Sequence, residues 1–245
     1  MDAKASLHRA TTTLAVVLAC IALMAIALVV APPPAEATGP HNQYVAVNVG
    51  DNGRFDIGAY PDAAGGATAG SWNLSYGWPG SPGTSFATIR VDGSSYIYGS
   101  TGTQVTPPTD AGVTNTSAWQ TTGDIKVTQL LTLVDNSATG RQDVVRIAYT
   151  VQNTGAVAHD VGLRLMIDTE VNYNDNALFR VPGVGALTTE REFIGAAIPR
   201  GTYVFYDLAD ATHVGYIATR FAGLPQTAWC SRTGAISTTH LGTTR

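Results

Sequence analysis

The sequence predicts an all-β fold, an antiparallel β-sandwich that follows an N-terminal hydrophobic signal or anchor helix. Three observations predict it: one long apolar run near the N-terminus, runs of alternating apolar and polar residues after it, and Asn-Gly or Asp-Gly pairs between those runs. Alternation with a period of two is typical of a half-buried strand, and the Asx-Gly pairs favour tight hairpin turns. Beyond residue 37 the sequence contains no convincing amphipathic helix pattern.

The apolar run extends from Leu14 to Val30, with basic residues before it and three prolines and Ala35-Glu36-Ala37 after it. A basic start, an apolar centre and a small-x-small exit are the parts of a secretory signal peptide. The run is also close to the roughly 20 apolar residues of a membrane span. We therefore expect residues 1–37 to be a signal peptide cleaved near Ala37 or a retained anchor. In either case we expect the rest of the chain to be extracytoplasmic, linked to a membrane only through segment 14–30 and only if the leader is not cleaved.

Charge and cysteine content narrow the function classes. The formal net charge is −4, with 14 basic against 18 acidic residues, so we expect no nucleic-acid partner. Of the two cysteines, Cys20 lies in the leader, so Cys230 has no intrachain disulfide partner once the leader is removed. Residues 38–224 suit one β-sandwich domain. Residues 225–245 are a Thr-, Gly- and Ser-rich stretch, which we expect to be a polar tail, disordered or belonging to a longer natural chain.

The strands are expected in chain order, beginning with two hairpins. The turn pairs Asn52-Gly53 and Asp92-Gly93 each separate two alternating runs. The expected strands are 44–49, 54–57, 85–91 and 95–98. The Gly-, Pro- and Thr-rich segments 59–84 and 100–117 are expected to be long loops or edge connections.

The second half of the domain has longer alternating runs. Segments 124–134, 143–152 and 159–168 are joined by polar turns, which predicts an antiparallel meander of three consecutive strands. Two further strands are expected at 202–208 and 213–220. In the third meander strand one face is apolar and is formed by Val161, Leu163, Leu165 and Ile167.

The densest polar cluster follows the third meander strand. Calcium prefers six to eight oxygen ligands, and this loop supplies carboxylates and amides at the alternating positions Asp168, Glu170, Asn172 and Asn174. The pattern then departs from a calcium loop, because the sixth place is Tyr173 instead of glycine. Three interpretations stay open: a calcium site, a sugar-binding loop that also uses Asp175, and polar residues that cap their own turns. No cofactor other than calcium is expected.

Aromatic residues are embedded in the first long loop, at Trp72, Tyr76 and Trp78. Exposed rings at these positions would stack on sugars or form a partner hot spot. Buried rings would form a small satellite core, which is the alternative interpretation.

Enzyme chemistry is a second possibility. A carboxylate pair would suit glycoside hydrolysis if Asp168 or Glu170 lay roughly 5–9.5 Å from another carboxylate. The candidates for that second carboxylate are Glu190, Glu192 and Asp207. His159 beside Asp160 is a base or a surface residue. The sequence shows no nucleophile elbow, phosphate loop or zinc signature, so no residue is assigned a catalytic role.

Six segments together carry a family resemblance: 88–93, 96–99, 161–169, 174–175, 179–183 and 188–190. They resemble a block found in uncharacterised bacterial secreted β-sandwich proteins, and the long strands faintly resemble the supersandwich of galactose-mutarotase-like domains. The resemblance implies a sandwich or supersandwich fold and a carbohydrate surface, without an activity. Two features depart from it: Asn176-Ala-Leu stands where Gly-Ala-Pro is expected, and aromatic closing strands are lacking after Leu224.

We therefore expect a secreted or cell-surface, non-enzymatic β-sandwich that binds carbohydrate, calcium or cell-envelope components. The alternative is a carbohydrate-active enzyme, mutarotase- or glycosidase-like, that uses the clustered carboxylates. A third is a structural module of a larger envelope protein. The expected binding residues are Asp168, Glu170, Asn174, Asp175, Trp72 and Trp78.

Overall fold

A computed structural model describes residues 39–60, 72–218, 226–232 and 235–244. The chain divides into two units, Met1–Pro34 and Ala35–Arg245. The expected leader, residues 1–37 with its apolar segment 14–30, lies outside the described residues. Within the described residues, no helix has both the length and the apolar character that a membrane crossing needs.

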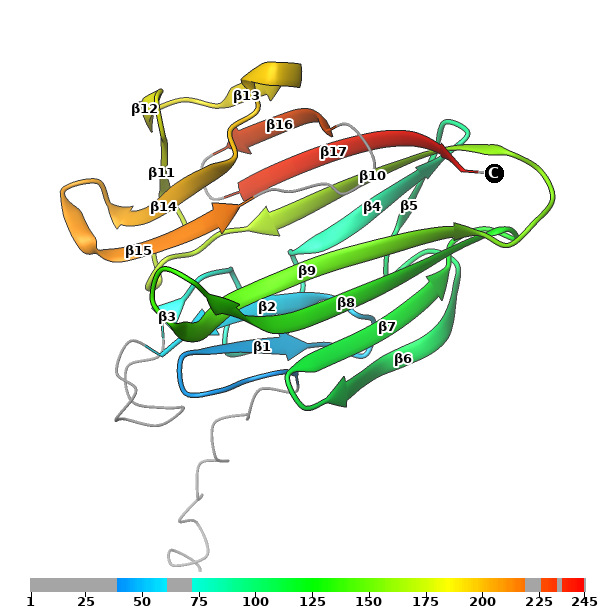
Figure 1. The fold of residues 1–245 in the computed structure, drawn as a ribbon, viewed down its shortest axis with the longest axis horizontal. Coiled ribbons are helices and arrows are strands. Elements are labelled where there is room, and N and C mark those ends of the chain that lie inside the picture. The colour runs from blue at the N-terminus through cyan, green and yellow to red at the C-terminus, as the bar shows by residue number, and fades with distance from the viewer. Residues whose placement is uncertain (1–38, 61–71, 219–225, 233–234, 245) are drawn as a thin grey trace, which may run out of the picture. The chain divides into compact units, whose positions relative to one another are not determined.

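The second unit is built almost entirely from antiparallel strands, which form four sheets (Figure 1). The β1 sheet has the order β1-β2-β3, with strands Val45–Val49, Phe55–Ala59 and Trp72–Asn73. The β8 sheet has the order β6-β7-β8-β9, with strands Thr103–Ala111, Thr114–Gln120, Ile125–Asn136 and Arg141–Asn153.

Two further sheets complete the unit. The β10 sheet has the order β13-β16-β17-β10-β4-β5. In chain order its strands are Phe86–Val91, Ser94–Ile97, His159–Asp168, Arg191–Ile194, Gln226–Arg232 and Ala235–Thr244. The β11 sheet has the order β12-β11-β14-β15, with β11 at Leu178–Val181, β12 at Gly185–Leu187, β14 at Gly201–Asp207 and β15 at Asp210–Ala218. A 3₁₀ turn, η1, spans Gly195–Ala197.

The predicted β-sandwich is confirmed, because the β8 and β10 sheets pack face to face across a shared apolar core. Ile89 of β4 and Val161 of β10 lie in one cluster with Ile125 and Val127 of β8. Each of these side chains is at most 6% exposed, and burying one such side chain contributes roughly 1.5–3 kcal/mol. The sandwich is thus held by the apolar faces that the alternating pattern predicted.

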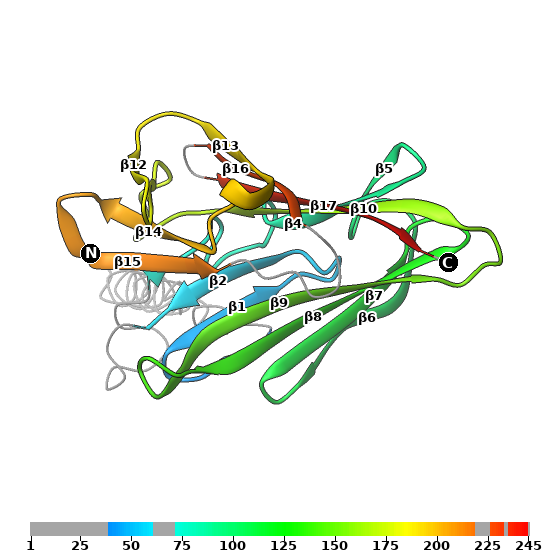
Figure 2. The ribbon, with the colours of Figure 1, turned by 45° about the horizontal axis from the view of Figure 1, so that its top comes forward.

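The β1 sheet packs on the other half of the β8 sheet. Val47 and Phe55 are fully buried against Leu131 and Leu133 of β8, and Leu165 of β10 joins the same cluster. Figure 2 shows β1 and β2 beside β8 and β9. The opposite face of β1 and β2 is therefore turned away from this core, and it meets the segment that follows β3.

Both predicted hairpin turns are confirmed. Gly53 has a φ of 78°, and Asp92 and Gly93 have φ values of 48° and 89°, the left-handed backbone that such turns need. The predicted three-strand meander is wrong in its last step. Strands β8 and β9 pair, but β10 leaves their sheet and pairs with β4 and β17. Two long strands that follow each other in the chain can pair in one sheet or face each other across a sandwich. The alternation of apolar and polar residues is the same in both arrangements, so the sequence pattern does not distinguish them.

Strands also form where the sequence predicted loops or a tail. Strands β6 and β7 occupy much of segment 100–117, although Pro107 and Pro108 lie inside β6. Proline is compatible with an edge strand, and the pairing of β6 with β7 is interrupted by register shifts. The expected polar tail, residues 225–245, contributes β16 and β17, and β17 pairs with β10 along all ten residues of β10. Its threonines are β-branched and suit a strand.

Candidate functional site

The segment after β10 lies directly against β3 and the residues that follow β3. Asn172 donates its backbone N–H to the carbonyl of Asn73 at 3.2 Å, and Tyr76 donates its own to the carbonyl of Asp168 at 2.9 Å. The side chain of Asn73 donates to Glu170 Oε2 at 2.8 Å in a buried contact. The structure thus brings together two regions, 72–78 and 168–176, that the sequence analysis predicted separately as binding regions.

A two-residue turn exposes the tip of the second region. Val171 and Asn174 form an antiparallel bridge, and their backbones exchange hydrogen bonds of 3.3 and 3.0 Å. Between them Asn172 and Tyr173 have φ values of 49° and 66°. Positive φ at both central positions is the backbone of a type I′ turn, and asparagine tolerates it well. Val171 itself is 1% exposed, in one core cluster with Phe179, and anchors the turn.

The side chains around this turn are aromatic and oxygen-rich. Tyr173 is 68% exposed and Tyr76 is 45% exposed. Asp175 is exposed, while Asp168 and Asn174 are half-buried. We call these five residues the turn surface. It offers aromatic faces together with carboxylate and amide oxygens, a combination that fits a polar ligand with hydroxyl groups.

The electrostatics of the turn surface centre on Asp168. Partial burial raises the pKa of this carboxyl, the neighbouring Asp175 carboxylate raises it further, and the Thr84 hydroxyl opposes the rise. Burial and a nearby negative charge both disfavour the ionised form of a carboxyl group, so Asp168 retains its proton to a higher pH than an ordinary aspartate.

Other predicted binding residues lie in different surroundings. Trp78 is 5% exposed, and its indole lies against Gly58, where an added Cβ would overlap the ring. Trp78 also makes an edge-on contact with Tyr60 at 6.3 Å between ring centroids. Its ring therefore belongs to a small apolar cluster, the alternative that the sequence left open. Trp72 is half-buried at the start of β3.

Two of the expected calcium ligands, Glu170 and Asn174, already accept hydrogen bonds within the protein. Glu170 is 8% exposed and accepts from Asn73, and Asn174 Oδ1 accepts the N–H of Asn176 at 3.0 Å. Across the described residues, no group of three or more His, Cys, Asp or Glu side chains is arranged to hold a metal ion. The oxygen atoms of this loop are thus partly committed to its own turn.

The other carboxylates considered for catalysis lie on or beside strands β13 and β14. Glu190 and Glu192 are exposed, and Glu192 lies on β13, opposite Cys230 of β16. Asp207 is exposed at the end of β14 and accepts the N–H of Ala209 at 2.9 Å. The carboxylate that contributes to the raised pKa of Asp168 is Asp175.

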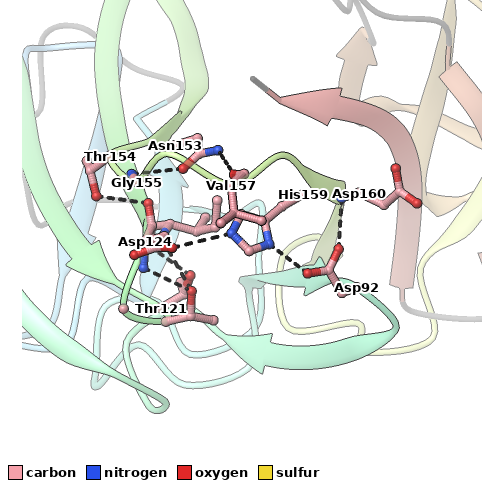
Figure 3. Close-up of polar contacts among 12 residues, drawn as sticks. Asp92, Thr121, Asp124, Asn153, Thr154, Gly155, Val157, His159 and Asp160 are labelled. Carbon is pink, nitrogen blue, oxygen red and sulfur yellow. Dashed lines mark hydrogen bonds and ion pairs between the residues drawn. The ribbon is translucent and has the colours of Figure 1, made fainter.

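A second polar cluster surrounds His159, at the start of β10. Its Nδ1 lies 2.6 Å from Asp92 Oδ2, and its Nε2 lies 3.5 Å from Asp124 Oδ2. Asp92 Oδ1 also accepts the backbone N–H of Asp160 at 2.9 Å. Figure 3 shows the imidazole between the two carboxylates. Asp92 belongs to the β4–β5 turn and Asp124 precedes β8, so the cluster links the two faces of the sandwich.

The charges of this cluster support one another. The hydrogen bond to Asp92 is the main cause of a raised pKa at His159, and the Asp124 carboxylate adds to it. The same hydrogen bond lowers the pKa of Asp92. An imidazole oriented by a carboxylate is also part of some catalytic triads. Here its second nitrogen faces another carboxylate instead of a nucleophile, so the arrangement is that of a structural clamp.

Sequence reasoning missed several buried polar residues. Asn73 was not singled out, because one asparagine at the end of a glycine-rich loop carries no periodic signal. Asp56 is 0% exposed although it lies in a predicted strand. The alternation of Phe55 and Ile57 around it could have indicated that Asp56 faces the other side, but not that this side is covered.

We compared the chain with known protein families, curated proteins and solved structures. No family model, no curated protein and no solved structure matches the chain.

Proposed function

We propose that this protein is a secreted or cell-surface, non-enzymatic β-sandwich that binds carbohydrate through the turn surface. The observation that carries the proposal is Tyr173, a bulky residue with a φ of 66° whose side chain is 68% exposed. The left-handed conformation costs a non-glycine residue roughly 1–2 kcal/mol. Because the ring is exposed, its packing within the protein offsets little of this backbone strain. Strained residues whose side chains pack poorly are typical of ligand-contacting sites.

The chemistry around Tyr173 suits sugar rings. An aromatic face packs against the apolar C–H face of a sugar, and hydroxyl groups at the ring edge bind carboxylate and amide oxygens. Tyr76 supplies a second exposed ring, and Asp168, Asn174 and Asp175 supply the oxygens. The deep connection through Asn73 and Glu170 fixes both segments relative to each other.

The negative charge of the protein bears on which class of carbohydrate it would bind. The two carboxyl groups of the turn surface and the net charge of −4 disfavour acidic polysaccharides. Neutral glycans are therefore the proposed ligand class. An N-terminal leader of the kind expected for residues 1–37 would deliver the protein to the compartment where such polymers of the cell envelope are found.

Affinity electrophoresis in gels that contain neutral polysaccharides tests this function. The expected result is retardation of the wild-type protein, strongly reduced by Tyr173→Ala and by Asp175→Asn. Tyr203→Ala is the matched control, because Tyr203 is also exposed, at 41%, but lies on β14. Equal migration of all variants across a broad panel of neutral glycans would refute the proposal.

The enzymatic alternative is supported by the Asp168–Asp175 pair alone. If the protein were such an enzyme, it should release reducing sugar or interconvert anomers, and Asp168→Asn should abolish this activity. Binding without any product, measured on the same polysaccharides, would separate a binding module from an enzyme. A structural module of the envelope would show neither binding nor product.

A further inference from the structure

The side chain of Asp56 is enclosed by the protein without a hydrogen-bonding partner. It lies on β2 and is 0% exposed, and both carboxylate oxygens are buried with no partner among the described residues. The ion pairs found in that part of the chain involve His159, Asp92 and Asp124, not Asp56. Buried carboxylates in proteins are paired, hydrogen-bonded or bound to a metal. The surroundings of Asp56 therefore call for a positively charged or proton-bearing partner.

The strand register explains how Asp56 comes to face inward. Phe55 and Ile57, on either side of it, pack into the core between the β1 and β8 sheets. Asp56 therefore points to the opposite face of the β1 sheet, where it lies directly across from Asn48 of β1. That face is covered by the segment after β3, so a carboxylate placed on an outer strand face becomes buried.

Segment 77–81 closes over Asp56. Gly80 donates its N–H to the carbonyl of Gly77 at 2.6 Å, and Asn48 Nδ2 donates to the carbonyl of Gly80. Asp56 Oδ2 and the carbonyl oxygen of Ser81 lie 3.1 and 3.3 Å from the position that a Cβ of Gly77 would take. Gly77 has a φ of 105°, which only glycine adopts readily. A carboxylate oxygen and a carbonyl oxygen are thus gathered around a residue without a side chain.

We propose that Asp56 and segment 77–81 form a binding site for a hard metal cation, held by the Asp56 carboxylate and the Ser81 carbonyl. Hard cations such as Ca²⁺ bind carboxylate, carbonyl and amide oxygens in flexible arrangements. On the neighbouring strand β3, Asn73 lies opposite Gly58, two residues from Asp56, and its buried amide oxygen Oδ1 also has no hydrogen-bonding partner among the described residues. Both Asp56 oxygens are acceptors, as a cation requires, whereas the indole N–H of Trp78, in segment 77–81, is a buried donor without a partner among the described residues.

A proton is the competing occupant of Asp56. Burial raises the pKa of this carboxyl to about 7, so protein without a cation is partly protonated at neutral pH. A bound cation favours the ionised form and displaces the proton. The two proposed ligands, Asp56 and Ser81, belong neither to the turn surface nor to the calcium ligands expected at residues 168–174, so substitutions can distinguish the two sites.

Thermal melting of the full chain measures cation binding directly. The protein is treated with a chelator, transferred to tetramethylammonium chloride, and melted with added Ca²⁺ or Na⁺ at constant ionic strength. The expected rise in melting temperature is roughly 5–10 °C when the cation is at about 100 times its dissociation constant. Asp56→Asn is expected to abolish the rise, and the control Asp175→Asn, in the turn surface, to retain it.

Terbium luminescence tests the location without a change at Asp56, which matters if Asp56→Asn does not fold. Tb³⁺ replaces Ca²⁺ at oxygen sites and is excited by a nearby tryptophan. Trp78 lies within segment 77–81, whereas Trp72 lies on β3, close to the 168–176 region. We expect Trp78→Phe to remove most of the sensitised emission and Trp72→Phe to leave most of it, with Ca²⁺ competing in both.

Each outcome decides the proposal. A rise in melting temperature with either cation that depends on Asp56, or emission that depends on Trp78, supports the site. Absence of any response to Ca²⁺, Na⁺ and Tb³⁺ overturns it and leaves Asp56 protonated. A response lost in Asp175→Asn or Trp72→Phe overturns it as well, because the cation then lies at residues 168–176.

Discussion

His159 Nδ1 lies 2.6 Å from Asp92 Oδ2, and this contact spans the position where the chain passes from one sheet of the sandwich to the other. His159 begins β10, after β9 has ended in the β8 sheet, and Asp92 lies in the turn between β4 and β5. The backbone of Asp160 donates to the same carboxylate. Asp92 thereby holds the first two residues of β10 against the edge of its own sheet and defines where the crossing ends.

Removing this contact is expected to loosen the crossing. Asp92→Asn and His159→Gln should each lower the melting temperature slightly, because both side chains are partly exposed and water replaces part of what is lost. The double variant should lose less than the sum of the single variants, since the two residues share one interaction. Thermal melts of the four proteins measure this. Strict additivity would show that the contact carries no coupling energy.

The pH dependence of the clamp follows from its shifted groups. The pKa of His159 is raised above 6.5, so its contribution to stability is complete below pH 6.5 and is lost as pH rises through the folded-state value. The pKa of Asp92 is lowered below 3.8, so its contribution is lost as pH falls through that lower value. The clamp should therefore stabilise the fold most between pH 3.8 and 6.5. Subtracting the urea-unfolding profile of His159→Gln from that of the wild type isolates the window.

Asp56 is expected to dominate the pH dependence near neutrality when no metal cation is present. Its pKa of about 7, against 3.8 as the ordinary value, means that the folded state resists ionisation of this group. The free energy of unfolding should fall as pH rises from 4 to 8, by an amount on the order of 4 kcal/mol.

Asp56→Asn provides the comparison, because asparagine has nearly the same shape and does not titrate. Its stability should be flatter between pH 4 and 8, and any remaining slope near pH 7 should respond to His159→Gln. Unfolding by urea in chelated tetramethylammonium buffer measures both. If the slope of unfolding free energy against pH were the same in Asp56→Asn as in the wild type, Asp56 would be ionised throughout this range. Another group would then have to balance its buried charge.

Strand positions were predictable where one face of a strand meets a core. The pattern of Val161, Leu163, Leu165 and Ile167 predicted an apolar face, and Val161 and Leu165 pack into the two central clusters. Sheet membership was not predictable in the same way, because a strand that pairs with its neighbour and one that faces it bury the same alternate residues. Strand β6 was missed because prolines and register shifts on an edge remove the usual signal.

The binding region was predictable only in outline. Oxygen-rich residues 168–176 follow a strand, and such loops lie at the surface. Two backbone hydrogen bonds and the side-chain contact of Asn73 with Glu170, 97 residues apart in the chain, hold this loop against 72–76. No local pattern encodes such a contact. For the same reason, the sequence could not show that Trp78 turns inward onto Gly58.

Asn73→Ala tests that contact. It removes the hydrogen bond to Glu170 and leaves a buried carboxylate oxygen without this donor, so we expect a loss of about 2 kcal/mol in the free energy of unfolding. Loss of glycan binding should accompany it, because both halves of the proposed region become less fixed. Glu192→Gln, an exposed change on β13, should alter neither quantity. A stable Asn73→Ala variant with normal binding would show that the two segments are held by their backbones alone.

Tyr173→Gly should raise stability and lower binding at once. Glycine adopts a φ of 66° without the strain that tyrosine carries, so the variant should gain about 1 kcal/mol in urea unfolding. Tyr173→Asn should retain part of this gain, since asparagine also tolerates the left-handed region. Both should weaken binding to neutral glycans, because the exposed ring is gone. If Tyr173→Gly were instead less stable than the wild type, the ring would contribute packing that outweighs its backbone strain, and the case for a ligand-contacting role of Tyr173 would lose its physical basis.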